Sequence, residues 1–410
     1  MSLRRAIVCL RAAGLVVLAA AVLCGCSTPA IDASRHRFYS GQFTKADELL
    51  TDAEVPEKDR VLLLMERGMV RQAEGEYEES SQDFIEASDL IYQLQTYSIS
   101  KGASSLVVND GVQDFRGTPF ERTLLHGFTA INHLSVANWD NAAVEARRII
   151  KSLSPSEKGD YPEDAFSRYM AGFCLEMIDD RSNAALQYRK ANDLASWLTI
   201  DPDSGLVALK PDTNSPSATW PAPDPAEGNA ELVCFVFVGR SPRGNDVWNE
   251  NWRPGMPMYA EIVHEGNVLG RSYNLADTMD LAYRTAQMEA ARKVAKTVGR
   301  VVIKEVLAQA AESSTDNEAV GELVRFILIG LLEQPDLRRW ETLPRWLQVA
   351  RVPCPEGIDE YDVIFRNSAG VAMRTVHVSA PITRRGRTYF SFCRDLPSLP
   401  ANTRPLSAGN

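Results

Sequence analysis

Two cysteines near the start of the chain are the first residues that could do chemistry. Cys24 and Cys26 flank a single glycine in the stretch VLCGCSTPA, residues 22–30. Such a pair suits a metal site, a redox pair or a processing site. No other Cys or His lies close enough in the sequence to complete a metal site. The residues that precede the pair decide between the remaining two.

Those preceding residues have the pattern of a secretory signal. Arg4, Arg5 and Arg11 supply positive charge, and residues 12–23 are apolar and uncharged. This run is too short to span a bilayer, which takes roughly 20 apolar residues. A charged start, a short apolar run and small residues after it are typical of export.

The segment Leu23-Cys24-Gly25-Cys26 resembles a bacterial lipobox. The resemblance implies that residues 1–25 are a lipoprotein signal peptide and that the thiol of Cys26 carries diacylglycerol. Each buried CH₂ contributes on the order of 0.8 kcal/mol, so two or three acyl chains anchor a protein stably. Ser27 after the lipid cysteine favours the outer membrane, facing the periplasm. The alternative is an ordinary cleaved signal with incidental cysteines.

Catalytic motifs are missing from the rest of the sequence. We find neither phosphate-binding glycine loop, no G-x-S-x-G and no H-E-x-x-H. His126 and His133 lie seven residues apart on one expected helix face, without an evident third zinc ligand. Asp359, Glu360 and Asp362 cluster in an expected turn, where a solvated acidic turn is the simplest interpretation. We therefore expect no metal, no cofactor and no catalysis.

The charge of the chain limits its partners. The net charge of −10 becomes −13 once the signal, with three arginines and no acid, is removed. An acidic chain without a basic stripe is a poor nucleic-acid binder, and it does not suit electrostatic docking onto anionic lipid. The composition, 45% hydrophobic and 24% charged, is that of an ordinary globular protein. The expected partners are the membrane, through the lipid, and another envelope protein.

An internal repeat organises the first half. The pattern Gly, aromatic, small, large, small in residues 41–53 recurs 34 residues later in 75–87. A 34-residue period with helical spacing is the tetratricopeptide signature, and looser copies follow near 137–146 and 172–191. We predict four helical hairpins over 33–195, with an inserted loop at 93–121; a plain antiparallel bundle is the alternative. The residues expected to pack between the helices are Gly41, Ala46, Gly68, Gly75, Ala142, Gly172 and Ala184.

In tetratricopeptide folds the first helix of each hairpin lines a concave face. Here that face is apolar, and its expected lining residues are Leu62, Met65, Met69, Leu124, Ile131, Leu134, Phe166, Tyr169 and Phe173. A wide apolar groove does not stay open to water without cause. Either the C-terminal region or the 93–121 loop fills it, or a partner helix binds in it.

The second half changes character after a Pro-rich and Asp-rich linker at 196–230. Its DPDSG stretch lacks the further oxygens and the glutamate of a calcium loop. Residues 231–240 read as a buried strand, followed by a hairpin near 258–273 and by helices over about 276–333. Four more strands are expected in 347–354, 360–366, 371–378 and 387–392. This predicts an α+β domain at 231–395, mainly antiparallel, with a helical insertion and a flexible tail at 396–410.

Four cysteines remain in the mature body. An exported compartment permits disulfides, and four cysteines allow three full pairings. The favoured interpretation is that all four, Cys174 included, are small buried side chains; the alternative is a disulfide between two of Cys234, Cys354 and Cys393, which share a region.

Three segments give the chain a wider resemblance. They are residues 115–134 (FRGTPFERTLLHGFTAINHL), 142–148 (AAVEARR) and Asp336–Gly357 (DLRRWETLPRWLQVARVPCPEG). With the lipobox and the repeats, the chain is similar to a group of uncharacterised bacterial lipoproteins with N-terminal tetratricopeptide repeats and a C-terminal α+β domain. Cys393 departs from what that resemblance implies. No reaction follows from it.

The sequence thus predicts an exported, lipid-anchored, non-catalytic scaffold for protein–protein interaction, α+β overall. The alternatives are an envelope hydrolase with its site in the C-terminal domain, and a binder of lipid or glycan between the two domains.

Overall fold

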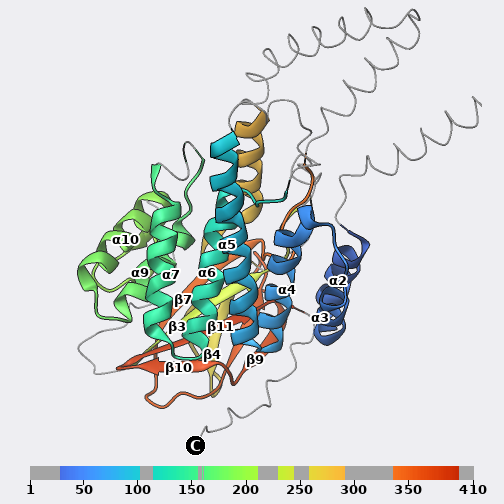
Figure 1. Cartoon of the computed structure of the whole chain (residues 1–410). Coiled ribbons are helices and arrows are strands. Elements are labelled where there is room, and N and C mark those ends of the chain that lie inside the picture. The colour runs from blue at the N-terminus through green and yellow to red at the C-terminus, as the bar shows by residue number, and fades with distance from the viewer. Residues whose placement is uncertain are drawn as a thin grey trace, which may run out of the picture.

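The protein is described by a computed structural model, which describes residues 28–101, 114–155, 159, 161–210, 230–243, 258–290 and 336–396. The expected signal peptide, the lipid cysteine and the tail beyond 396 lie outside these residues. The fold is α+β, with helices first and strands after them (Figure 1). Among the described residues, no helix is both long and apolar enough to cross a membrane.

The first half forms four helical hairpins that follow one another along the chain. They are α2 (Pro29–Tyr39) with α3 (Phe43–Thr51), α4 (Arg60–Glu74) with α5 (Tyr77–Lys101), α6 (Pro119–Ser135) with α7 (Trp139–Ser152), and α9 (Ala165–Glu176) with α10 (Arg181–Leu194). A short 3₁₀ turn, η1 (Glu57–Asp59), precedes α4. Each hairpin packs against its neighbours in chain order.

The glycines and alanines of the repeat lie where the chain turns or where helices meet. Gly41 and Gly75 have φ of 72° and 85°, the left-handed conformation that ends a helix most easily with glycine. Gly68 lies against the ring of Phe84, and Gly172 against Tyr188 in the fourth hairpin. Ala46, Ala142 and Ala184 are buried.

The second half forms two sheets of the C-terminal region and one small hairpin. The hairpin pairs β1 (Leu198–Ile200) with β2 (Val207–Leu209). The five-stranded sheet has the order β10 (Ile382–Arg385), β11 (Thr388–Arg394), β3 (Ala230–Val238), β7 (Trp346–Cys354), β6 (Tyr273–Asp277). The four-stranded sheet has the order β5 (Asn267–Arg271), β4 (Tyr259–His264), β8 (Tyr361–Arg366), β9 (Ala372–Val378).

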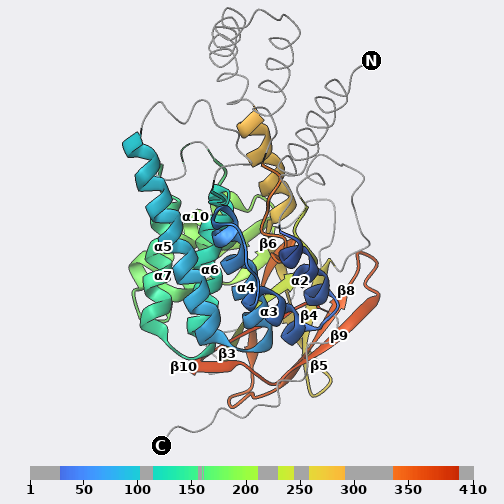
Figure 2. The same ribbon diagram turned by 45° about the vertical axis from the view of Figure 1, so that its right-hand side comes forward.

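Strand β3 explains how these parts stack. Its alternate residues Val233, Phe235 and Phe237 join the core shared with the helices. The residues between them, Leu232, Cys234 and Val236, join the core shared with the four-stranded sheet. A strand covered on both faces reads as a continuous apolar run, and ELVCFVFV is such a run. The molecule therefore has three layers, with helices, the five-stranded sheet and the four-stranded sheet in that order (Figures 1 and 2).

The strands expected at 231–240, in the 258–273 hairpin and in the last four segments are confirmed. The mainly antiparallel pairing is confirmed too, with β11 and β3 as the parallel pair among the described strands.

Three expectations need correction. The 93–121 loop begins later, because α5 continues to Lys101 and the first helix-breaking glycine is Gly102. The 196–230 linker contains the β1–β2 hairpin. The helix expected from residue 276 begins at 278 after β6 and is described to 290; the rest lies outside the described residues.

The four cysteines of the body are free, small buried side chains, as the favoured interpretation of the sequence had it. Cys234 faces Ser391 across the β3–β11 ladder, and Cys393 lies two residues further along. Cys354 pairs with Ala230, four residues from Cys234 on β3. Two strand residues span roughly 6.6 Å along the chain and neighbouring strands lie about 4.8 Å apart. Together these offsets place the Cα atoms of Cys234 and Cys393 about 8 Å apart, and Cys354 lies further still from Cys234, so neither pair reaches the 4.4–6.8 Å Cα separation of a disulfide.

We predict that Gly68→Ala destabilises the fold. A Cβ at Gly68 would lie 2.4 Å from a ring atom of Phe84, and that ring is fully buried, so it has no room to move. Overpacking of this kind costs roughly 1–3 kcal/mol. The matched control is Gly127→Ala in α6, whose Cβ would meet Phe166 at 3.9 Å and which should be neutral or stabilising by up to about 1 kcal/mol. Urea unfolding measures both; equal midpoints would contradict the close packing.

The buried thiols should be inert. Burial raises the pKa of Cys234 and of Cys354 to about 12, and the thiolate is the reactive form. We expect Cys174, Cys234, Cys354 and Cys393 to take up no maleimide at pH 7.5 in the folded protein, and to take up four equivalents in denaturant. Intact-mass measurement distinguishes the two states.

Candidate functional site: the covered concave face

The nine residues expected to line the concave groove do lie together on the first helices of three hairpins. All of them are buried: Leu62, Met65 and Met69 on α4; Leu124, Ile131 and Leu134 on α6; Phe166, Tyr169 and Phe173 on α9. They belong to one cluster with residues of the five-stranded sheet. The groove is therefore filled by the chain itself, as one of the two sequence alternatives proposed, and it is not open to a partner helix.

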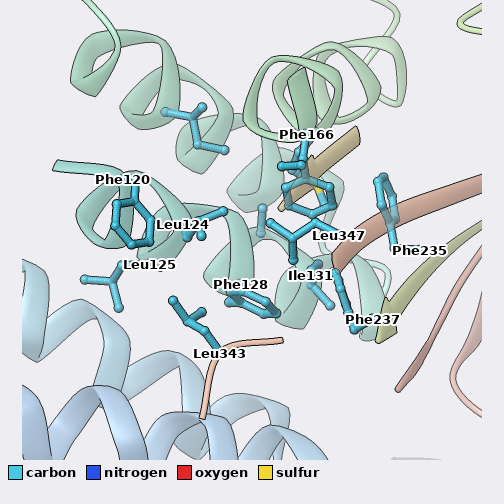
Figure 3. Packing of buried hydrophobic residues seen from close by; sticks show 14 of the residues in the cluster. Phe120, Leu124, Leu125, Phe128, Ile131, Phe166, Phe235, Phe237, Leu343 and Leu347 are labelled. Atoms are coloured by element: carbon cyan, nitrogen blue, oxygen red, sulfur yellow. The ribbon is translucent and has the colours of Figure 1, made fainter. Parts of the chain in front are cut away.

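Aromatic side chains from β3 and β11 fill most of this face. The ring of Phe237 lies 5.2 Å from that of Phe128, and Phe235 lies 5.7 Å from both Phe166 and Phe173. Edge-to-face and tilted pairs at these distances add to the burial of apolar area. Figure 3 shows the rings of Phe128, Phe166, Phe235 and Phe237, with Ile131 and Leu347 beside them, between the helices and the sheet.

Residues 336–345 fill the remainder of the groove without regular secondary structure. Trp340 is fully buried, with its ring 5.7 Å from Phe84 and 5.9 Å from Phe128. Its backbone N–H donates to Glu121 Oε1 at 2.9 Å. The other oxygen of Glu121 accepts from the backbone N–H of Thr118 in the capping box of α6. We call 336–345 the groove segment.

Glu66 on α4 holds the middle of the groove segment. Its carboxylate accepts from the backbone N–H groups of Glu341 and Thr342 at 3.0 and 3.2 Å. Arg35 of α2 donates to the same carboxylate through Nε and Nη2 at 2.8 and 2.6 Å. Both charged side chains are almost fully buried. Four N–H donors thus bond to the buried carboxylate of Glu66. A buried carboxylate is stable only when it has such hydrogen-bond partners.

A second carboxylate extends this cluster toward the surface. Glu341 accepts from Arg35 at 3.1 Å and from Arg240 at 2.5 Å, and Tyr39 donates to its backbone oxygen at 2.6 Å. Burial raises the pKa of Glu341 above its usual value, while Arg35 and Arg240 partly offset that rise. A raised carboxyl pKa is typical of some catalytic acids. Here, however, the carboxylate of Glu341 is paired with Arg35 and Arg240, which both belong to the packed cluster.

Arginine–carboxylate clusters also lie at both ends of the covered face. Arg338 of the groove segment pairs with Asp59 at 2.7 Å, and both are almost fully buried. At the other end, Arg351 of β7 contacts Glu176 of α9 at 2.7 Å and Glu231 of β3 at 2.6 Å. Each cluster joins residues far apart in the sequence, so together they fix the register of the helices on the sheet.

The other residues considered from sequence do not form a site. His126 Nδ1 lies 2.8 Å from Glu145, and His377 lies 3.0 Å from Asp362 across the β8–β9 ladder. Asp201 accepts from Ser204 within its own turn, which leaves the DPDSG stretch a turn rather than a calcium loop. Within the described part of the chain, no group of three metal-ligating side chains could hold an ion.

A narrow cleft lies between the α4–α5 turn and the strands β9–β11. It is lined by Met69, Gln72, Ala73, Tyr77, Val376, His377, Val378, Ser379, Ala380, Pro381, Phe392, Cys393 and Arg394. Its volume is about 40 Å³, room for a few waters. A sugar or an acyl chain needs a far larger pocket, so the cleft gives no support to the lipid-binding or glycan-binding alternative.

Sequence reasoning missed the groove segment as the occupant of the concave face, although Asp336–Gly357 was the most distinctive part of the chain. One signal was available. The stretch DLRRWETLPRW alternates charged and large apolar residues without the period of a helix or a strand. Such a stretch must find both an apolar pocket and charge partners, and only a preformed groove offers both.

The chain matches no protein-family model, no curated protein and no solved structure. The site is therefore described by its own geometry: an apolar concave face, an internal segment within it, and buried ion pairs that hold the segment in place.

We predict that Glu66→Gln destabilises the protein by roughly 1.5–3 kcal/mol, because the neutral amide loses the charge-assisted hydrogen bonds with Arg35. Arg35 then keeps Asp32, Glu341 and the backbone oxygen of Arg339 as partners. The matched control is Glu86→Gln. Glu86 also pairs with an arginine, Arg60, at 2.8 Å, but both side chains are exposed by more than a third, so the loss should be about 1 kcal/mol or less. Chemical unfolding of both variants tests this; similar losses would show that the Glu66 cluster does not hold the fold.

Proposed function

We propose that the protein is a lipid-anchored cell-envelope scaffold of the tetratricopeptide type, which binds another envelope protein and does no catalysis. The lipobox at Leu23–Cys26 supports the anchor. The four consecutive hairpins, with glycines at the close contacts Gly68–Phe84 and Gly172–Tyr188, support the repeat type. Since the concave face is filled, the partner binds elsewhere on the array.

The observation that carries this proposal is the outer side of α10. Helical arrays need a polar outer face on the terminal hairpin to stay soluble. Here Leu186, Leu194 and the following Trp197 are exposed by 40%, 38% and 48%. Leu186 and Leu194 lie eight residues apart on α10, which places them on the same broad side of the helix, and Trp197 follows three residues after its end. We call these three exposed residues the α10 patch.

The α10 patch suits a protein partner. Large apolar side chains that gather on one element mark interaction sites more often than single scattered ones do. Tryptophan is enriched among the residues that dominate binding energy at interfaces. Trp197 is also held in place, since its Nε1 donates to the backbone oxygen of Asn274 at 3.2 Å, so it loses little freedom on binding.

Photo-crosslinking in the native envelope tests the proposal. A photoreactive residue at Leu186 should give one dominant protein adduct, identified by mass spectrometry. The matched control is the same residue at Val268 on β5, which is exposed to the same degree, 42%, but lies on the four-stranded sheet. Cys26→Ser should stay unlipidated and lose the adduct by losing its place in the envelope.

Two outcomes contradict the proposal. Equal, weak labelling from Leu186 and Val268 would show that the α10 patch is not an interface. A lipid-free and correctly exported protein, recognised from its intact mass, would show that Cys26 is not an anchor.

A further inference from the structure

We propose that a pocket beside the start of α4 binds small aliphatic amines, in which an ammonium group is carried on an apolar stem. The pocket is separate from the concave face and from the α10 patch, and its ligand does not depend on the lipid at Cys26. Three features point to this class of ligand: the volume of the pocket, its apolar floor and two carboxylates at its rim.

The pocket lies where α5 runs past the start of its partner helix α4. Arg60, the first residue of α4, pairs with Glu86 of α5 at 2.8 Å, and α5 then continues to Lys101 (Figures 1 and 2). The 3₁₀ turn η1 and Asp114 border the space that this step leaves. Its volume is about 320 Å³, which lies at the lower end of the roughly 300–1,000 Å³ typical of small-ligand pockets.

The rim of the pocket is held in place by the groove segment. The backbone N–H of Phe115 donates to the backbone oxygen of Lys58 at 2.8 Å, which keeps Asp114 beside η1. Arg338 donates to the same oxygen at 2.9 Å and to Asp59 at 2.7 Å, and the side chains of Arg338 and Asp59 are almost fully buried. The rim is therefore formed before a ligand arrives, and a preformed site loses less freedom on binding.

The floor of the pocket is apolar. It is formed by Val61 of α4 and by Leu90 and Leu94, which lie one turn apart on the same side of α5. Val61 is buried, and both leucines pack partly against the main core. An aliphatic stem that enters the pocket covers the leucine surface that the core leaves open, and each CH₂ removed from water strengthens binding by roughly fourfold.

Two carboxylates without a partner lie at the rim. Glu57 and Asp114 both line the pocket, and within the described part of the chain neither side chain makes an ion pair or a hydrogen bond. Arg60 lines the pocket as well, but its guanidinium pairs with Glu86. The charges of Arg60 and Glu86 compensate each other, so the rim keeps the two negative charges of Glu57 and Asp114. Such a rim attracts a cation and repels an anion.

Floor and rim together favour an ammonium group on an unbranched stem. An ammonium has three N–H donors and no acceptor, so one such group can donate to both carboxylates while its stem covers the floor. A fatty acid or a phosphate would bring like charge to the rim. A neutral alcohol would cover the floor but leave both carboxylates without a counter-charge.

Titration with n-hexylamine, followed by isothermal calorimetry, tests the proposal. The chain from residue 26 onward carries Cys26→Ser, so that neither lipid nor detergent takes up the probe, and it keeps every described residue. We expect hexylamine to bind at one site and to bind roughly tenfold more tightly than n-hexanol, because a hydrogen bond to a charged group contributes more than one between neutral groups. Hexanoate should not bind. From ethylamine to hexylamine, affinity should rise by up to about fourfold for each CH₂.

Removal of the rim charges provides the second arm of the test. The double variant Glu57→Gln with Asp114→Asn should bind hexylamine roughly tenfold more weakly and bind hexanol as before. The matched control is Asp52→Asn with Glu54→Gln, which removes two exposed carboxylates just before η1 that do not line the pocket. It should leave the affinity for hexylamine unchanged. Urea unfolding of both double variants checks that they fold like the parent.

Three outcomes overturn the proposal. Equal affinity for hexylamine and hexanol would show that the rim does not recognise a cation. No binding of hexylamine would show that the pocket is closed to ligands in solution. Equal binding by the rim variant and its control, with both folded, would place the amine elsewhere on the protein.

Discussion

The structure depends on one constraint: an array of helical hairpins with an apolar inner face must cover that face. Nine large apolar side chains from α4, α6 and α9 lie on it, and every one is buried. Covering a side chain of this size contributes about 1.5–3 kcal/mol. The five-stranded sheet and the groove segment supply the cover, so helices and sheet share one core. Residues 196–230 separate the helical half of the sequence from the strand half, but both halves contribute side chains to that one core.

The buried ion pairs have a different role from the apolar contacts. Desolvation of two charges offsets most of their attraction, so a buried pair adds little net stability even though breaking it is costly. What such pairs do well is exclude alternatives. The aromatic contacts of Phe235 and Phe237 would tolerate small shifts of the sheet along the helices. A shift of one residue would leave Arg351 without Glu176, and Glu66 without the N–H groups of Glu341 and Thr342. The ion pairs thus select one register.

Local patterns in the sequence were enough to predict most of the helices and the longer strands. The 34-residue spacing located the hairpins, and alternation located β8 and β9, because each reflects a periodic contact with a near neighbour. Local patterns did not predict contacts between distant residues. Nothing local indicates that β11 pairs in parallel with β3, or that Cys234 and Cys393 are offset on the same ladder. Likewise the apolar face was predicted from residues such as Met65 and Phe166, but its occupant had no periodic signal. Trp340 contacts Phe84 from 256 residues further along the chain.

Closing the concave face moves binding to the outside of the array, and the outside is not uniform. Most of its apolar side chains are single and scattered, as is normal for a soluble protein. Packing within the body explains why α5 becomes apolar past Asp89, since Ile91 is buried and Leu90 and Leu94 pack against the same core. The exposed residues of the α10 patch are the departure. Leu186, Leu194 and Trp197 are exposed by 40%, 38% and 48%. Packing within the array does not explain that exposure, whereas a surface met outside the array does.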